Sequence, residues 1–263
     1  MNNVKKIIKI LDFDIEYIDQ GLDNKLVLFF AHGLGSSVEQ WTSQIEFFKQ
    51  FCRVIAISFQ GHGNSTKSNK KADYSINKYA EVTIALIKKL NIKRVVWIGN
   101  SMGGVIGYEV MHINDKLISK LITNGTTPIL EFKNYQLKIM KIMDYILIKL
   151  LGYSKYIAIA AKNSSSNDIA NKEVYKCMEK SSPKAVMESH IYLGNYNYKK
   201  IIDKFFEKIV ILKCDKDAGI NKYIEKCILD NVKIINISMV GHIFNLEKPK
   251  EYNKIIYNEI KNM

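Results

Sequence analysis

A single serine lies between glycines at the junction of two apolar segments. The stretch GNSMGG, residues 99–104, follows the apolar run VVWI and precedes a segment of helical pattern. Ser101 is therefore expected in a sharp strand-to-helix turn, where Gly99 and Gly103 remove Cβ atoms that would clash. A hydroxyl at the tip of such a turn projects from the carboxyl edge of the sheet and can attack a substrate. A glycine-rich turn that merely packs closely is the alternative for this motif taken alone.

A nucleophilic serine requires a base, and the chain has five histidines: His32, His62, His112, His190 and His242. His242 follows the last apolar run and precedes the final helical segment, so its loop is expected at the carboxyl edge beside Ser101. For His112, within an amphipathic helix, and His190, within a helical insertion, packing or surface roles are expected. His32 and His62 precede glycines in loops ahead of the serine. His242 is the predicted base.

The base in turn needs a carboxylate that fixes its tautomer and stabilises the imidazolium. Asp215 and Asp217 follow the apolar run KIVILKC, again at the end of a predicted strand. Asp217 lies further into the loop and can turn toward His242, so we predict it as the acid, with Asp215 capping the turn. The first amides of the helix that begins at Met102 have no intrahelical partner and can stabilise an oxyanion.

Short apolar runs alternate with helical patterns along the chain. KKIIKILDFDIEYID alternates about Asp12 and predicts a hairpin. Six further runs are apolar without alternation, as in strands buried on both faces of a parallel sheet. They are KLVLFFAHG, CRVIAISF, KRVVWIGN, KLISKLITNG, KIVILKCD and VKIINIS. Helical candidates include residues 75–90, with Ser75 as a possible cap, and residues 248–263. The pattern predicts an α/β fold with a mostly parallel open sheet and helices on both faces.

One interval departs from this alternation. Residues 128–200 are almost wholly helical in pattern, without a strand signal, and include the polar patch NSSSND. We interpret them as a helical cap inserted between two parts of the sheet domain, residues 1–127 and 201–263. The cap contains twelve Lys and six Asp or Glu. This excess could favour anionic substrates or surfaces, although a solvated lysine face is the simpler interpretation.

On these residues the chain resembles the α/β-hydrolase superfamily, in the branch of small capped esterases, lactonases and carbon–carbon hydrolases. The order Ser101, Asp217, His242 matches the order of that fold's triad. FFAHGLGSSVEQW resembles its oxyanion loop, which implies that the Leu34 amide acts with the Met102 amide. SFQGHGNS and GHIFNLEKPKEYN resemble two further family loops. The chain departs from the family at Ser58, where Asp is usual, and at Cys214, where Gly is usual; Ser58 can still accept hydrogen bonds in a turn.

The resemblance implies a serine hydrolase that cleaves a small, lipophilic carboxylic ester or lactone through an acyl-enzyme, without metal or organic cofactor. Apolar cap residues, including LKIMKIMDYILIKLL, suggest an apolar pocket beneath the lid, or simply cap packing. GNSMGG also resembles the serine loop of carbon–carbon hydrolases acting on ring-cleavage diketones. A thioesterase, an amidase and a slow-turnover ligand receptor on the same fold remain open.

Composition excludes several other classes. The net charge of +13 comes from dispersed lysines with no basic block, which argues against nucleic-acid binding. Cys52, Cys177, Cys214 and Cys227 form no C-x-x-C pair and are predicted to be free thiols. No signal-peptide pattern and no long uncharged apolar span are present, so we expect a cytoplasmic protein without stable membrane anchoring. A small-molecule substrate is expected, and the oligomeric state is left open.

Overall fold

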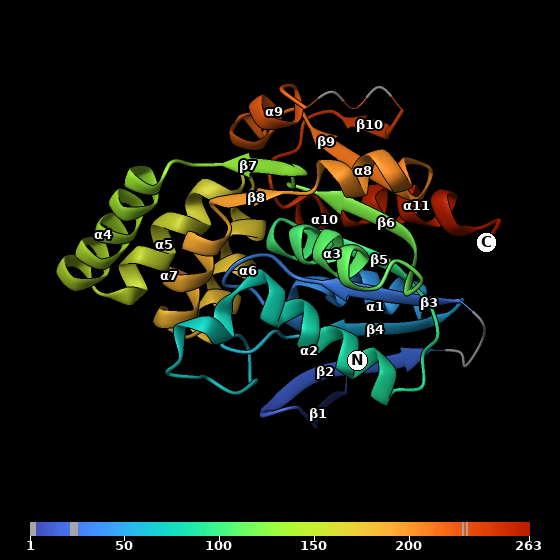
Figure 1. Cartoon of the computed structure of the whole chain (residues 1–263), viewed down its shortest axis with the longest axis horizontal. Helices are drawn as coiled ribbons and strands as arrows, with labels where there is room; N and C mark the ends of the chain where they lie inside the picture. The colour runs from blue at the N-terminus through green and yellow to red at the C-terminus, as the bar shows by residue number, and fades with distance from the viewer. Residues whose placement is uncertain (1–3, 22–25, 228, 230) are drawn as a thin grey trace.

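The computed structural model describes residues 4–21, 26–227, 229 and 231–263. Within these residues eight strands form one sheet in the order β1-β2-β4-β3-β5-β6-β9-β10 (Figure 1). The β1–β2 and β2–β4 pairs are antiparallel, and all pairs from β4 to β10 are parallel, which confirms the predicted fold class and hairpin. The strands are β1 (Lys5–Ile10), β2 (Phe13–Gly21), β3 (Val27–Ala31), β4 (Arg53–Ile57), β5 (Val95–Asn100), β6 (Ile118–Asn124), β9 (Ile209–Cys214) and β10 (Lys233–Ile237).

Helices cover both faces of this sheet (Figure 1). Because successive strand residues point to opposite faces, neighbouring side chains of one apolar run reach different halves of the core. Phe29 stacks on Trp97 with ring centroids 4.7 Å apart, whereas Phe30 packs against Trp41 at 5.0 Å. On the Phe29 face lie α2 (Ile76–Lys89), α3 (Met102–Ile113) and α8 (Lys199–Phe205); on the Phe30 face lie α1 (Thr42–Phe48), α10 (Phe244–Glu247) and α11 (Pro249–Ile260).

The helix ends follow local sequence signals. The Ser75 side chain accepts a hydrogen bond from the Lys78 amide at 3.2 Å and caps α2, as predicted. The predicted helical segment 248–263 contains α11, whose Tyr252, Ile256 and Ile260 are buried against the sheet. The remaining short elements are α9 (Ala218–Ile224) and the 3-10 turns η1 (Val38–Trp41), η2 (Lys71–Tyr74) and η3 (Phe206–Lys208).

Between β6 and β9 the chain forms a layer of four helices over the carboxyl edge of the sheet, here called the cap. They are α4 (Asn134–Leu151), α5 (Tyr153–Ser164), α6 (Asp168–Glu179) and α7 (Pro183–Tyr192). The expectation of no strand in this interval was wrong: β7 (Ile129–Glu131) pairs antiparallel with β8 (Asn195–Asn197) at its base. Three residues per strand are too few to produce a periodic signal, and the pairing spans 66 residues of sequence.

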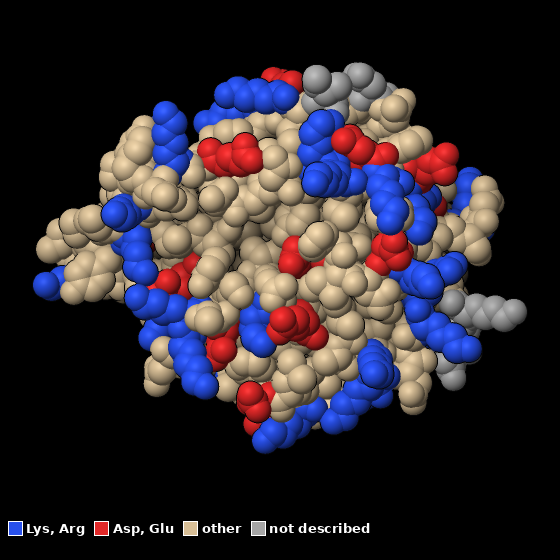
Figure 2. All heavy atoms as spheres, viewed as in Figure 1, with Lys and Arg blue, Asp and Glu red and all other residues tan. Residues whose placement is uncertain are grey.

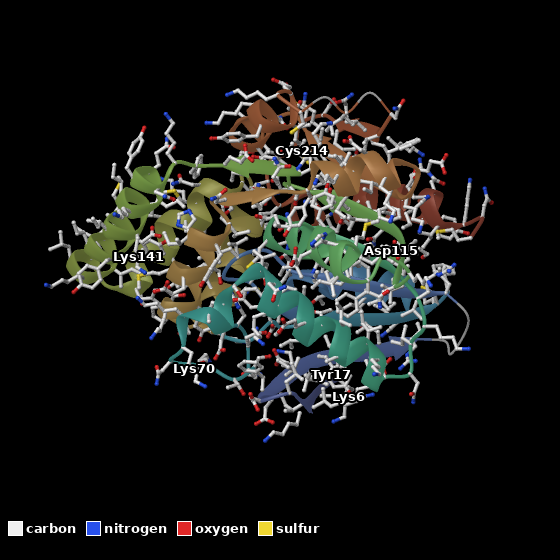
Figure 3. All side chains as sticks on the ribbon, in the orientation of Figure 1. Lys6, Tyr17, Lys70, Asp115, Lys141 and Cys214 are labelled. Carbon is white, nitrogen blue, oxygen red and sulfur yellow. The ribbon has the colours of Figure 1, made fainter. Side chains whose placement is uncertain are left out.

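The side-chain view shows the relation of cap and sheet. In Figure 3, Tyr17 on β2 and Cys214 on β9 lie toward opposite edges of the sheet, while Lys141 on the cap lies at the far end from Asp115. Figure 2 shows lysines and arginines spread over this face with acidic residues between them, rather than one basic patch.

In the described part of the chain, no helix has the length and apolarity needed to cross a bilayer. All four cysteines are free, with Cys227 half-buried and the others buried.

Candidate active site

Ser101 occupies a strained turn between β5 and α3. Its φ and ψ are 50° and −117°, a conformation that a non-glycine residue rarely adopts. A Cβ at Gly103 would lie 2.1 Å from the Ala31 carbonyl oxygen, and one at Gly99 would lie 2.5 Å from the Gly104 nitrogen. Neither position has room for a side chain. The turn is held by the Ser101 amide, which donates to the Asn124 carbonyl at 2.9 Å, and by Thr126 Oγ1, which donates to the Ser101 carbonyl.

His242 and Asp217 meet at the same edge of the sheet. His242 Nδ1 lies 2.7 Å from Asp217 Oδ2, and the aspartate side chain is only 10% exposed. An ionised carboxylate accepts only, so Nδ1 carries the proton and Nε2 of the neutral ring is left as an acceptor. Ser101 and His242 line one cavity. The sequence-predicted serine and histidine therefore share this cavity, and the predicted aspartate contacts the histidine.

Asp215 has a different environment. Its carboxylate accepts the Met239 amide at 2.9 Å and the Val240 amide at 3.2 Å, three and two residues before His242, respectively. These backbone hydrogen bonds, that of Met239 above all, lower the pKa of Asp215 below its usual value. Met239 has a positive φ of 62°, as found in tight turns. The Asp215 carboxylate stabilises this turn through its hydrogen bonds to the two amides. Asp215 thus contacts the backbone that leads to His242, and Asp217 contacts the imidazole.

Two residues whose backbone amides have no acceptor among the residues that the structure describes line the cavity beside Ser101. Leu34 and Met102 both line it, and within the described residues neither amide donates to a protein acceptor. Met102 is the first residue of α3, where backbone N–H groups lack intrahelical partners and the helix dipole favours negative charge. The adjacent Gly33 amide donates to Gln40 Oε1 at 3.1 Å, which fixes the loop that carries Leu34.

A buried amide network that the sequence did not reveal supports the His242 loop. Asn100 Nδ2 donates to the His242 carbonyl at 3.0 Å, and Gln40 Nε2 donates to Asn100 Oδ1 at 2.8 Å. Asn124 Nδ2 reaches the same carbonyl at 3.3 Å, and Asn245 Nδ2 donates to the Gln40 carbonyl at 2.8 Å. These residues come from four separate segments, so no local motif reveals the network. It joins the serine turn to the histidine loop.

A second buried network surrounds Ser58, the residue that departs from the family's aspartate. Ser58 Oγ accepts the Val38 amide at 3.1 Å and donates to Glu16 Oε2 at 2.7 Å. The Glu16 carboxylate is fully buried and also accepts from the Asn64 amide and side chain. A carboxylate is thus present, supplied by β2 instead of position 58. No motif signal marks Glu16, because it lies 42 residues upstream of Ser58 in an ordinary alternating strand.

The other histidines lie in three environments. His32 accepts the Phe59 amide at Nε2, and its Nδ1 donates to the Gly33 carbonyl at 2.7 Å. Burial, reinforced by His62, lowers the pKa of His32 well below its usual value, and burial lowers that of His62 to about 4. His112 is exposed. His190, for which a packing or surface role was expected, is half-buried and lines the cavity, and its Nδ1 lies 2.7 Å from Asp144 Oδ2.

The cavity lies between the cap and the carboxyl edge of the sheet and has a volume of about 370 Å³. This volume suits a small organic ligand. Apolar cap side chains that line it include Met140, Val174, Met178, Val186 and Leu193. Of the stretch 137–151, Met140 alone lines the cavity, and Ile139, Ile142 and Leu150 are exposed. The expected apolar pocket is present, but most of its cap lining comes from helices other than α4.

Polar contacts hold the cap on the loop that carries Leu34. Lys180 Nζ lies 2.8 Å from Glu39 Oε1, and Ser181 Oγ donates to the Gly35 carbonyl at 2.7 Å. Burial alone would raise the pKa of Glu39, but hydrogen bonds from Lys180, Lys5 and Ser37 outweigh it and lower the pKa to about 2. The cap and the predicted oxyanion loop are therefore mechanically linked.

Comparison with known proteins places this geometry in context. A model of the α/β hydrolase fold matches residues 27–230. A bifunctional esterase/perhydrolase of Acinetobacter calcoaceticus is 32% identical over 120 residues, 44% of this chain and 43% of its own length. An (E)-2-((N-methylformamido)methylene)succinate hydrolase of Acinetobacter baylyi is 34% identical over 110 residues, 41% of this chain and 40% of its own length. The matched segments thus span less than half of these relatives.

Solved structures extend the likeness to nearly the whole chain. A bromoperoxidase from Bacillus anthracis superposes with a TM-score of 0.85 over 98% of this chain and all of its own, at 19% identity. A carboxylesterase of Nitrososphaera gargenis does so with a TM-score of 0.83 over 97% of this chain and 98% of its own, at 17% identity. At these identities the likeness is one of fold.

Proposed function

Because the chain belongs to the α/β-hydrolase fold family, we propose that it is a serine hydrolase that cleaves carboxylic esters or lactones through an acyl-enzyme. Ser101 is the nucleophile, His242 the general base and acid, and Asp217 the orienting carboxylate. The observation that carries this proposal is the 2.7 Å contact of Asp217 with His242 at the cavity that Ser101 enters from its strained turn.

The first half of the reaction forms the acyl-enzyme. His242 Nε2 takes the Ser101 hydroxyl proton as Oγ bonds to the substrate carbonyl carbon, and the Leu34 and Met102 amides donate to the resulting oxyanion. The imidazolium, stabilised by Asp217, then protonates the departing alcohol as the carbon–oxygen bond breaks. The second half repeats these steps with water, which His242 deprotonates; the product acid leaves and Ser101 regains its proton.

The cavity wall supports a lipophilic substrate. Apolar side chains of the cap face the serine across a space of about 370 Å³, which suits an ester or lactone of small-molecule size. The esterase/perhydrolase relative points in the same direction. The resemblance to the serine loop of carbon–carbon hydrolases rests partly on Asn100, but here its amide is engaged by Gln40 and the His242 carbonyl. We therefore favour the ester or lactone.

Turnover of p-nitrophenyl acetate and butyrate, with fluorophosphonate labelling, tests the proposal. We expect Ser101-dependent turnover and labelling, both lost in Ser101→Ala. A wild-type protein that neither turns over esters nor reacts with the label would refute it. A screen of acyl chain lengths beside ring-cleavage diketones and thioesters then separates the bond types, and turnover of the diketones alone would favour carbon–carbon cleavage.

A further inference from the structure

The cap contributes its own histidine–carboxylate pair to the cavity. His190 on α7 has Nδ1 2.7 Å from Asp144 Oδ2 on α4, and the Tyr156 hydroxyl on α5 donates to Asp144 Oδ1 at 3.1 Å. His190 and Tyr156 both line the cavity that contains Ser101. Three cap helices therefore converge on one carboxylate, and the two side chains that it orients face the space where a substrate would lie.

The buried position of Asp144 distinguishes this arrangement from a polar cluster on the protein surface. The Asp144 side chain is only 9% exposed, and Asp144 is the one buried residue of α4. Placing a carboxylate in an apolar layer is unfavourable unless hydrogen bonds compensate it, and an apolar side chain would pack the cap at least as well. The carboxylate fixes the orientation of His190 and Tyr156 through both of its oxygens.

The hydrogen-bond directions define what the pair can bind. Both available protons, on His190 Nδ1 and on the Tyr156 hydroxyl, are donated to Asp144. In its neutral form with the proton on Nδ1, the imidazole offers Nε2 as an acceptor, and the phenol oxygen offers its lone pairs. Another polar cap side chain on the cavity, Ser164, already donates its hydroxyl to the Ala160 carbonyl at 2.9 Å. The cap thus presents acceptors in apolar surroundings.

We infer that His190 and Tyr156 form a subsite for a hydroxyl group that the substrate carries away from its scissile carbonyl. The inference rests on the proposed function and narrows its substrate class to hydroxylated lipophilic esters. The substrate hydroxyl would donate to His190 Nε2 or to the Tyr156 oxygen while its apolar chain contacts Met140, Val186 and Leu193. An unsubstituted chain would leave these acceptors unpaired on binding, which disfavours it.

The test compares ethyl hexanoate, octanoate and decanoate with their ω-hydroxy analogues and with the matching ω-carboxylate monoesters, by acid release at constant pH. A second series places the hydroxyl in the alcohol part, as the monoesters of α,ω-diols. We expect the hydroxylated ester of at least one series to have a kcat/KM about three- to tenfold higher than its unsubstituted partner, as one hydrogen bond supplies. The ω-carboxylate monoesters should have a lower kcat/KM than the unsubstituted esters.

Variants connect that preference to the subsite. In His190→Phe, which keeps an aromatic ring without Nε2, the ratio of the two kcat/KM values should fall to about one, with a smaller fall in Tyr156→Phe. A variant that only disturbed packing would lower kcat/KM for both substrates by the same factor and leave their ratio unchanged. The matched control is His112→Phe at the exposed histidine of α3, which should preserve the wild-type ratio.

Three results overturn the inference: equal kcat/KM for hydroxylated and plain esters throughout, a preference that persists in His190→Phe, or a preference for the carboxylate esters. The last would mean that the cap binds an anion through a protonated histidine. Turnover of plain esters that depends on Ser101 would leave the proposed function intact in all three cases. Absence of any Ser101-dependent turnover would instead refute the proposed function itself.

Discussion

Two histidine–aspartate pairs border one cavity in this molecule, and their closest contacts are alike. His242 and Asp217 come from loops after β10 and β9, whereas His190 and Asp144 come from two helices of the cap. In each pair Nδ1 lies 2.7 Å from a carboxylate oxygen, and each aspartate side chain is about one-tenth exposed. The two pairs differ in what lies around them.

The core pair shares its edge of the sheet with a strained serine and two unpaired amides, while the cap pair is surrounded by apolar side chains and a phenol. An oriented imidazole becomes a catalytic base when a nucleophile and a site for the developing charge are arranged with it. Without them the same pair is a hydrogen-bonding group. The comparison teaches that the neighbours of a histidine–aspartate pair determine its chemistry.

Removing the carboxylate from each pair tests this contrast most strongly. Asp217→Asn should lower kcat on a plain ester by roughly 10³- to 10⁴-fold, because it favours the wrong tautomer of His242 and leaves the imidazolium unstabilised. Asp144→Asn should change the same kcat by less than about tenfold, since no proton transfer depends on it. Steady-state kinetics of the two purified variants provide the measurement.

Asp215→Asn is the matched control in the acid loop, because its carboxylate binds backbone amides and not the imidazole. It should lower kcat by less than about tenfold. A large loss in Asp215→Asn with activity retained in Asp217→Asn would transfer the acid role to Asp215. Equally large losses of kcat in Asp217→Asn and Asp144→Asn would contradict the different roles given to the two pairs.

The buried amide network that supports the His242 loop provides a further test of the core pair. Asn100→Ala removes the hydrogen bond to the His242 carbonyl and leaves Gln40 Nε2 without its Asn100 acceptor. We expect kcat to fall by roughly tenfold with little change in KM, and the free energy of unfolding to fall by about 1–3 kcal/mol. Kinetics and urea denaturation measure the two effects. An unchanged kcat in a destabilised variant would reduce Asn100 to a purely structural role.

Glu16 should affect stability and not turnover, because unlike Asn100 it does not line the cavity that contains Ser101. Glu16→Gln replaces one acceptor oxygen with an amide that faces the Ser58 hydroxyl or the Asn64 amide, so a buried hydrogen bond is lost. The free energy of unfolding should fall by about 1–3 kcal/mol. Glu173→Gln, at a carboxylate that is 46% exposed, serves as control and should change it by less than about 0.5 kcal/mol. Equal denaturation midpoints for both variants would contradict the assigned role.

We expect the smallest effect on stability from Glu39, which helps to attach the cap, and this effect depends on pH. The pKa of Glu39 is about 2 in the folded protein, below its ordinary value of 4.5. Since the folded pKa is the lower one, the resulting stability is complete above about pH 4.5 and is lost as the pH falls toward 2. Because Glu39 is partly exposed, we expect a contribution of about 1 kcal/mol. Glu39→Gln should flatten this part of the stability profile relative to wild type, and parallel profiles would contradict the assignment.

Local pattern was sufficient for much of the fold. The six apolar runs became the parallel strands β3, β4, β5, β6, β9 and β10, and the hairpin about Asp12 became β1 and β2. These elements are predictable because burial on both faces and strand alternation each leave a periodic signature in consecutive residues. The strand ends then bring Ser101, Asp217 and His242 to one edge through topology alone.

Contacts between distant segments were not predictable from a single sequence. Glu16 reads as an ordinary residue of an alternating strand, and its partners Ser58 and Asn64 follow more than forty residues later. The outward direction of Ile139, Ile142 and Leu150 depends on how α4 packs, which composition does not specify. The contact of His190 was not predicted for the same reason: a packing or surface role was expected for it, and its partner Asp144 lies 46 positions away.

The Glu16–Ser58 contact also bears on how such chains diverge. The two residues lie on neighbouring strands or their ends, since β2 pairs with β4 and Tyr17 faces Ile57 across the ladder. The acid that the family resemblance leads us to expect at position 58 is absent from that position, whereas in space the Glu16 carboxylate lies beside the same loop. A carboxylate can therefore reach one place in the fold from either of two positions in the chain. Searches for remote relatives gain by scoring such residue pairs across adjacent strands together.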